Sequence, residues 1–79
     1  MKTEQFLEEI CKTLRKPAGS ITVTDTPDTL AEWDSLGHLE IIGTVDTVLK
    51  IPTDCPELQN FTSIGQLVDA LKAKGALED

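Results

Sequence analysis

The chain has 79 residues and a net charge of −7, which limits what it can do. A domain this short buries only about 60% of its unfolded surface, so one small core and no deep enclosed active site are expected. No segment approaches the roughly 20 apolar residues of a membrane helix, and the acidic start lacks a secretory signal, so we expect a cytoplasmic protein. Cys11 and Cys55 lack metal-site or disulfide spacing and are interpreted as reduced, partly packed thiols.

Negative charge is concentrated in the middle of the chain. Residues 17–49 contain six acidic residues and no Lys or Arg, whereas residues 1–16 contain four basic and three acidic residues. Because nucleic-acid backbones are bound by clustered Lys and Arg, this distribution disfavours a nucleic-acid partner. A protein that is steered to the middle of the chain should itself be basic.

Apolar residues at helical spacing predict a first helix over residues 4–15, with Thr3 as the candidate N-cap. A long connection is predicted over residues 17–34, because residues typical of turns recur there. Loops of this length are uncommon unless they have a function. Four apolar residues are expected to hold the loop against the helices: Ile21, Val23, Leu30 and Trp33.

The strongest helical pattern predicts a second helix over residues 35–49, which ends before Pro52. Its apolar face is expected to contain Leu36, Leu39, Ile42, Val45 and Leu49, joined by Ile41 and Val48, with Glu40, Gly43, Thr44 and Thr47 opposite. Gly37 and Gly43 are expected on the solvent side, where each costs roughly 1 kcal/mol relative to Ala. A smooth contact surface for a partner and ordinary sequence tolerance explain these glycines equally well.

A short third helix over residues 56–60 and a fourth over residues 64–74 complete the prediction. Ser63 and Gln66 have the spacing of a capping box at the start of the fourth helix, and Gly75 is the expected C-cap. Residues 76–79 are expected to form a frayed tail. The predicted fold is all-α, a four-helix bundle in one domain over residues 1–79, with a long loop between the first two helices.

Ser35 is the serine that invites a chemical interpretation. Ser20 lies in a predicted turn and Ser63 has a capping role, whereas Ser35 begins the longest amphipathic helix beside Asp34. Unpaired backbone amides and the helix dipole favour an attached phosphate there. The simpler alternative is that Asp34 or Ser35 is only an N-cap, and position alone favours that alternative.

The string Trp33-Asp34-Ser35-Leu36-Gly37-His38-Leu39-Glu40 resembles the phosphopantetheine attachment segment of acyl and peptidyl carrier proteins, whose core is Asp-Ser-Leu at the start of the second helix. Other segments that look like family features are Thr26-Pro27-Asp28, Ile51-Pro52, Phe61-Thr62-Ser63-Ile64 and Leu67-Val68. The resemblance therefore covers essentially the whole chain. Trp33 before the core looks more like a specialised or pathway-dedicated carrier than a housekeeping fatty-acid carrier. Many fatty-acid carriers have a carboxylate two residues after the serine, where this chain has Gly37 followed by His38. The length of the chain is that expected of a free-standing carrier.

The resemblance implies a carrier with no catalytic activity of its own. Ser35 would be joined to 4′-phosphopantetheine from coenzyme A by a phosphopantetheinyl transferase. Asp34 would help organise this transfer, near the magnesium of the transferase, and Leu36 would lie beside the arm and contact partner enzymes. The thiol of the arm would carry acyl intermediates of fatty acid, polyketide or related lipid biosynthesis as thioesters.

The resemblance also implies partners. The expected contact residues for basic patches on acyl-loading and acyl-processing enzymes are Trp33, Gly37, Glu40 and Asp46. The residues that would line an interior for the acyl chain are Ile42, Val45, Leu49, Ile64 and Leu67, although a bundle core explains them equally well. We expect a monomer without a metal site and without membrane or nucleic-acid partners.

Three alternatives remain open from the sequence. A peptidyl or aminoacyl carrier has the same chemistry and is loaded by an adenylating enzyme. An acidic helical interaction module without a prosthetic group fits composition and periodicity equally well. A hydrolase would use Ser35, His38 and either Asp34 or Glu40, but it lacks an evident oxyanion hole and a pocket that so short a chain can enclose.

Overall fold

The computed structural model describes residues 1–78, in which three α-helices dominate. These are α1 (Thr3–Thr13), α2 (Ser35–Thr44) and α3 (Ile64–Ala73). The chain continues from α2 directly into the π-helical segment η1 (Val45–Leu49), and η2 (Pro56–Leu58) is a single 3-10 turn. The described residues contain no strand, so the all-α prediction is confirmed. The expected short helix over residues 56–60 is only this 3-10 turn, so the structure has three α-helices rather than four.

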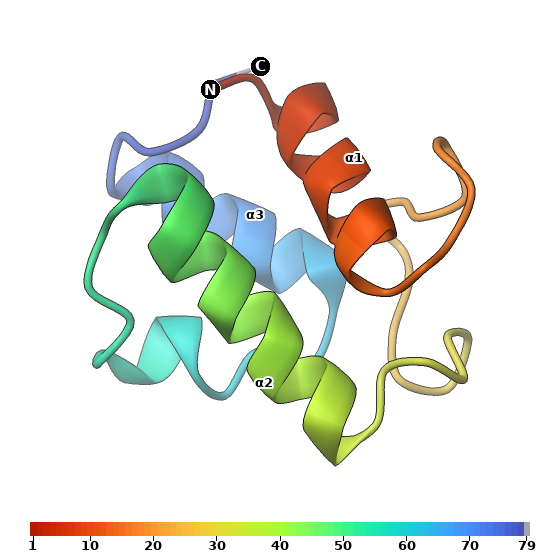
Figure 1. Cartoon of the computed structure of the whole chain (residues 1–79). Helices are drawn as coiled ribbons and strands as arrows, with labels where there is room; N and C mark the ends of the chain where they lie inside the picture. The colour runs from red at the N-terminus through yellow and green to blue at the C-terminus, as the bar shows by residue number, and fades with distance from the viewer. Residues whose placement is uncertain (79) are drawn as a thin grey trace.

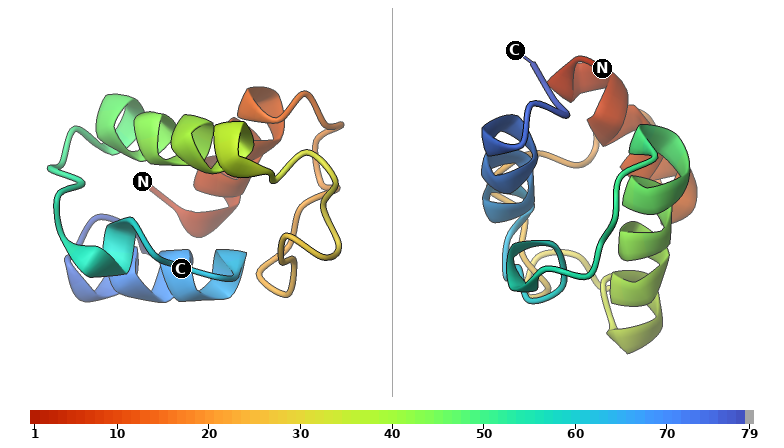
Figure 2. Two further views of the ribbon diagram at one scale, coloured as in Figure 1. Left: turned by 90° about the horizontal axis from the view of Figure 1, so that it is seen from below. Right: turned by 90° about the vertical axis from the view of Figure 1, so that its left-hand side faces the viewer.

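Figures 1 and 2 show α2 and α3 on opposite sides of the molecule, with α1 across one remaining side and η2 beside α3. The connection between α1 and α2 closes one end. The two chain ends lie together, since the Thr3 amide donates to the Glu78 carbonyl oxygen at 2.8 Å. The expected frayed tail is therefore wrong up to Glu78: Leu77 is buried and the chain beyond it pairs with the N-terminus. Asp79 lies outside the described residues.

The core is apolar and contains side chains from every helix. No polar or charged residue among those described is buried. Side chains with no exposed surface are Phe6, Ile10, Ile41, Val45, Leu58, Ile64, Leu67 and Leu71. Burying each such side chain contributes roughly 1.5–3 kcal/mol, which is how three short helices form one stable unit.

The long loop is packed against this core, as expected. Ile21, Leu30 and Trp33 are buried, whereas the side chain of Val23 is 44% exposed and does not anchor the loop. The backbone of Val23 does so instead, because its carbonyl oxygen accepts a hydrogen bond from the Gly65 amide at 2.8 Å.

The predicted apolar face of the second helix is confirmed only in part. Ile41 and Val45 are fully buried, but Leu36 and Leu39 are each 65% exposed. Gly37 is buried rather than exposed, because the Glu32 carbonyl oxygen of the loop occupies the place where a Cβ would lie. Gly43 is exposed with open space beside it, so its predicted position is confirmed.

The helix boundaries follow local capping. α1 begins at Thr3 with Lys2 as its N-cap, so Thr3 is the first helical residue instead of the cap. It ends two residues earlier than expected because Arg15 is left-handed, with φ of 60°, and the Lys16 amide bonds to the Cys11 carbonyl oxygen at 2.8 Å. This is a Schellman ending with Arg in the position that usually holds Gly.

The start and end of α3 largely match the expected signals. Ser63 is the N-cap, as predicted, and its hydroxyl accepts from the Gln66 amide at 3.1 Å. The Gln66 side chain accepts from the Thr62 amide, one residue before the expected partner in the capping box. α3 ends at Ala73, and Gly75 has the expected left-handed conformation with φ of 75°.

Candidate functional site

Asp34 is the N-cap of α2. Its backbone is extended, its carboxylate accepts from the Gly37 amide at 2.8 Å, and its carbonyl oxygen accepts from the His38 amide at 2.8 Å. Two of the amides at the start of α2 are satisfied in this way. The capping role that the sequence left open between Asp34 and Ser35 thus belongs to Asp34.

Ser35 is the first residue of α2 and is exposed. Within residues 1–78 its hydroxyl makes no hydrogen bond, and the amides of Ser35 and Leu36 donate to no protein acceptor. These amides lie at the positive end of the helix dipole, where a phosphate is stabilised. The site therefore combines an exposed hydroxyl with two backbone amides that have no protein acceptor among the described residues.

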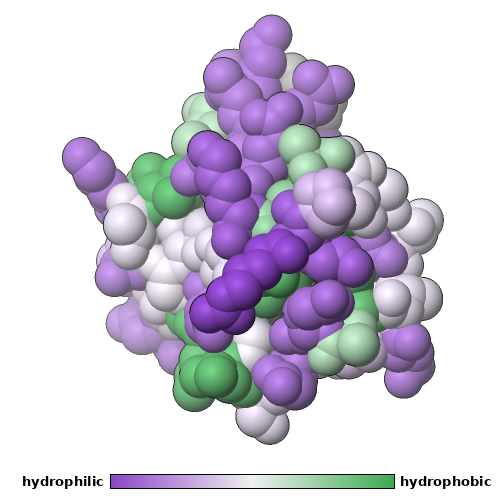
Figure 3. All heavy atoms as spheres, turned by 45° about the vertical axis from the view of Figure 1, so that its right-hand side comes forward, coloured by the Kyte–Doolittle hydropathy of each residue, from purple (hydrophilic) through white to green (hydrophobic). Residues whose placement is uncertain are grey.

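A surface groove of about 540 Å³ begins at Ser35. Its lining consists of Pro27, Trp33, Asp34, Ser35, His38 and Leu39. Figure 3 shows a patch of hydrophobic side chains at the lower left of the molecule, and α2 begins at the lower end of the molecule in Figure 1. The exposed apolar residues of α2 are Leu36 and Leu39. A flexible arm with polar and apolar parts fits such a groove, so the residues present suit a phosphopantetheine group on Ser35.

His38 connects three segments, a role that sequence reasoning missed. The Trp33 indole N–H donates to His38 Nδ1 at 3.0 Å, and His38 Nε2 lies 2.5 Å from the Gln59 carbonyl oxygen. The His38 ring also stacks on Phe61, with 4.6 Å between ring centroids. The chain has only one Trp, one His and two Phe. The closeness of Trp33 and His38 in the sequence was the one feature that could have indicated a contact between them.

The four residues expected at a partner surface are not equally accessible. Asp46 is exposed and Glu40 is half-buried, so their carboxylates are available. Trp33 is only 4% exposed because its ring packs on Phe61, and Gly37 is buried under the loop. Trp33 and Gly37 therefore offer little surface to a partner, whereas Leu36 and Leu39 are exposed.

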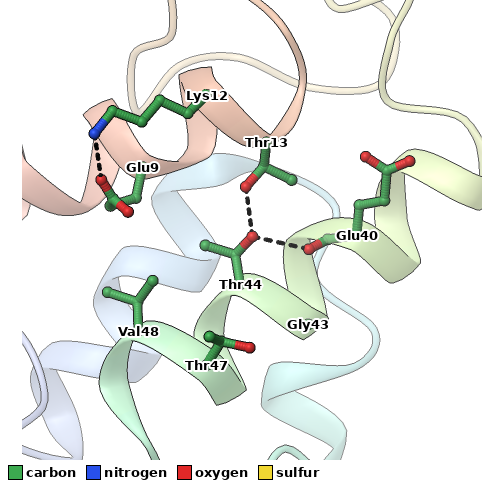
Figure 4. A pocket seen from close by; sticks show the side chains of 8 residues that line it. All are labelled: Glu9, Lys12, Thr13, Glu40, Gly43, Thr44, Thr47 and Val48. Carbon is green, nitrogen blue, oxygen red and sulfur yellow. Dashed lines mark hydrogen bonds and ion pairs between the residues drawn. The ribbon is translucent and has the colours of Figure 1, made fainter.

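A second groove, of about 500 Å³, lies between α1 and the α2–η1 segment (Figure 4). Thr44, expected on the solvent side, bonds there to the Thr13 hydroxyl at 2.5 Å and donates to the Glu40 carbonyl oxygen at 3.0 Å. Lys12 pairs with Glu9 at 3.0 Å, and this hydrogen bond and the Glu9 charge raise the pKa of Lys12. The polar groups of this groove thus bond mainly to one another, unlike Ser35.

Cys11 is buried and Cys55 is half-buried, and both are free thiols, as expected. Among residues 1–78 no group of three or more His, Cys, Asp or Glu side chains is arranged to hold a metal ion. Helices long and apolar enough to cross a membrane are likewise absent from this part of the chain.

Comparison of the chain with models of protein families, with curated proteins and with solved structures returns no match.

Proposed function

We propose that this chain is an acyl carrier protein with phosphopantetheine attached to Ser35. The observation that carries the proposal is the start of α2, where an exposed hydroxyl without a hydrogen bond lies beside two amides that have no acceptor among the described residues. Asp34 takes the capping role, so modification of Ser35 breaks no cap. The fold that this proposal implies is the carrier-protein fold, with the 3-10 turn η2 in place of its short third helix.

The transfer step uses Ser35 as the acceptor. The Ser35 oxygen forms a bond to the phosphorus of phosphopantetheine, the phosphoanhydride bond of coenzyme A breaks, and 3′,5′-ADP leaves. The hydroxyl proton passes to a base of the transferase. The amides of Ser35 and Leu36 would be the donors available to the new phosphodiester, because the Asp34 carboxylate bonds to the Gly37 amide. When bound, the group supplies the thiol that holds an acyl chain as a thioester.

Docking of partner enzymes would use the outer face of α2 and η1. Leu36 and Leu39 supply exposed apolar contacts, and Glu40 and Asp46 supply negative charge. Weak, salt-sensitive attraction to basic patches would let one carrier visit several enzymes in turn. The arm then presents its cargo at a high effective concentration, since the docked reaction is intramolecular. Peptidyl or aminoacyl cargo would use the same residues.

The hydrolase alternative has weaker support. Both ring nitrogens of His38 are bonded, to Trp33 and to the Gln59 carbonyl, so neither is available to take a proton from Ser35 while these bonds persist. The exposed leucines of α2 are compatible with an interaction module that has no prosthetic group, which makes this the second candidate.

One experiment separates the candidates. The folded protein is incubated with coenzyme A, magnesium and a broad-specificity phosphopantetheinyl transferase, and its intact mass is measured. The proposal predicts a gain of one phosphopantetheinyl unit in the wild type and in Ser63→Ala, and no gain in Ser35→Ala. No gain on the folded wild type would contradict the carrier function and favour the interaction module.

A further inference from the structure

Three aromatic rings close the junction between the start of α2 and the segment that follows η2. The ring centroid of Trp33 lies 6.1 Å from that of His38 and 5.5 Å from that of Phe61, and the centroids of His38 and Phe61 are 4.6 Å apart. Each ring therefore contacts the other two. They come from the end of the long loop, the first turn of α2 and the chain just before α3. We refer to Trp33, His38 and Phe61 as the ring cluster.

Hydrogen bonds hold the ring cluster in one arrangement. Because the Trp33 indole N–H donates to His38 Nδ1, the proton of the neutral imidazole is on Nε2 and is donated to the Gln59 carbonyl oxygen. Within residues 1–78 this is the hydrogen bond that joins α2 to residues 50–63. His38 therefore links α2 to this segment through a hydrogen bond.

Two members of the ring cluster, Trp33 and Phe61, belong to the buried apolar core. The core residues Ile41, Val45, Leu58 and Leu67 have no exposed surface, so an acyl chain would have to displace packed side chains to enter. Trp33 and His38 also line the groove that begins at Ser35. An arm on Ser35 thus meets the ring cluster from the solvent side.

We propose, on the basis of the proposed carrier function, that His38 is a positioning residue that keeps the acyl chain out of the bundle. The cargo then lies in the groove lined by Pro27, Trp33, His38 and Leu39, where it stays accessible to partner enzymes. Such a carrier presents its thioester directly and needs no step that extracts the chain from the core.

The test uses the whole protein, loaded at Ser35 with amide-linked analogues of short, medium and long saturated acyl-pantetheines. Nuclear magnetic resonance follows the methyl groups of Ile41, Val45 and Leu67 and the single indole N–H of Trp33. We expect shifts in the groove residues, unmoved core methyl groups, and a Tm that varies by less than about 1 °C with acyl length. Core methyl shifts and a Tm that rises with acyl length would overturn the inference.

Variants test the role of His38 itself. In His38→Phe, which keeps a ring but loses both hydrogen bonds, and in His38→Ala, longer acyl chains should shift the core methyl groups. Leu39→Ala is the matched control, which should weaken the groove shifts and leave the core unmoved. A folded His38→Ala variant whose core stays unmoved would show that His38 does not exclude the chain. If Ser35 accepts no arm at all, the intact mass reveals it, and the carrier function fails together with this inference.

Discussion

Ser35 and Ser63 both lie at the start of an α-helix, but the first backbone amides of the two helices are hydrogen-bonded differently. At α3, the amides of Ile64 and Gly65 donate to loop carbonyl oxygens at 3.0 Å and 2.8 Å, and the Gln66 amide donates to Ser63. At α2, Asp34 accepts two hydrogen bonds and leaves the first two amides without a protein acceptor in the described chain. One serine hydroxyl is part of a cap and the other is not.

The loop between α1 and α2 creates this difference. Its backbone at Val23 and Asp25 completes the start of α3, whereas its last residues pass over Gly37 and leave Ser35 outside. A helix start whose amides are all bonded has no donors left for a phosphate. A helix start with two unbonded amides keeps these two donors for a ligand. The same loop thus stabilises one helix and exposes the candidate site on the other.

The largest expected effect concerns Gly37, where the loop meets α2. A Cβ at this position would overlap the Glu32 carbonyl oxygen, which is backbone and cannot turn away. We expect Gly37→Ala to lower the free energy of unfolding by about 3 kcal/mol in urea titrations. Gly43→Ala, with open space beside it, should instead raise it by up to about 1 kcal/mol. Equal effects of the two substitutions would mean that the loop does not pack on the start of α2.

Charge reversal compares the outer faces of the two helices. Asp46 and Asp69 are both exposed, one in η1 and one in α3, so each change to Lys alters the net charge equally. If partners dock beside Ser35, Asp46→Lys should lower kcat/KM of the phosphopantetheinyl transferase about tenfold, and Asp69→Lys by less than about twofold. High salt should reduce the difference. Similar losses of kcat/KM for both variants would mean that the transferase responds to the overall charge of the protein and does not dock on one face.

Removing each hydroxyl compares the two serines directly. Ser63→Ala should cost about 1 kcal/mol of unfolding free energy because the Gln66 amide loses its cap. Ser35→Ala should change it by less than about 0.5 kcal/mol, since the Ser35 hydroxyl bonds to nothing in the described chain. Thermal or urea unfolding measures both variants. A large loss in Ser35→Ala would assign Ser35 a structural role.

The smallest expected change in stability is that of Asp34→Asn. Asn caps helices about as well as Asp, so unfolding should shift by less than about 0.5 kcal/mol, whereas Asp34→Ala should cost about 1 kcal/mol. If the carboxylate also helps organise the transfer, Asp34→Asn should be modified more slowly than the wild type, as followed by intact mass over time. Unchanged rates would limit Asp34 to its capping role.

The features that the sequence predicts well are local. The helical path that begins at Ser35 ends at Leu49, as apolar spacing and Pro52 predict, although α2 itself ends at Thr44 and the last five residues are π-helical. The Ser63 cap and the left-handed Gly75 follow from residues within one turn. The position of Ser35 at the start of a helix is also confirmed, whereas its role as an attachment site stays a prediction.

The features that the sequence does not reveal depend on contacts between distant segments. By spacing, Leu36 and Leu39 fit the predicted apolar face as well as Ile41 and Val45 do. Only the path of the loop over Gly37 shows that the two leucines are exposed. The ordered tail depends on pairing between Glu78 and the N-terminus, which no local pattern records. The link from His38 to Gln59 similarly spans 21 positions.

The most direct test of the central claim is to locate the modification. The wild-type protein is treated with coenzyme A, magnesium and the transferase, digested, and mapped by fragmentation mass spectrometry. The account predicts a phosphopantetheinyl group on the peptide that contains Ser35 and none on the peptides with Ser20 or Ser63. A group on either of those serines, or none on a folded protein, would contradict the claim that the open start of α2 is the site of attachment.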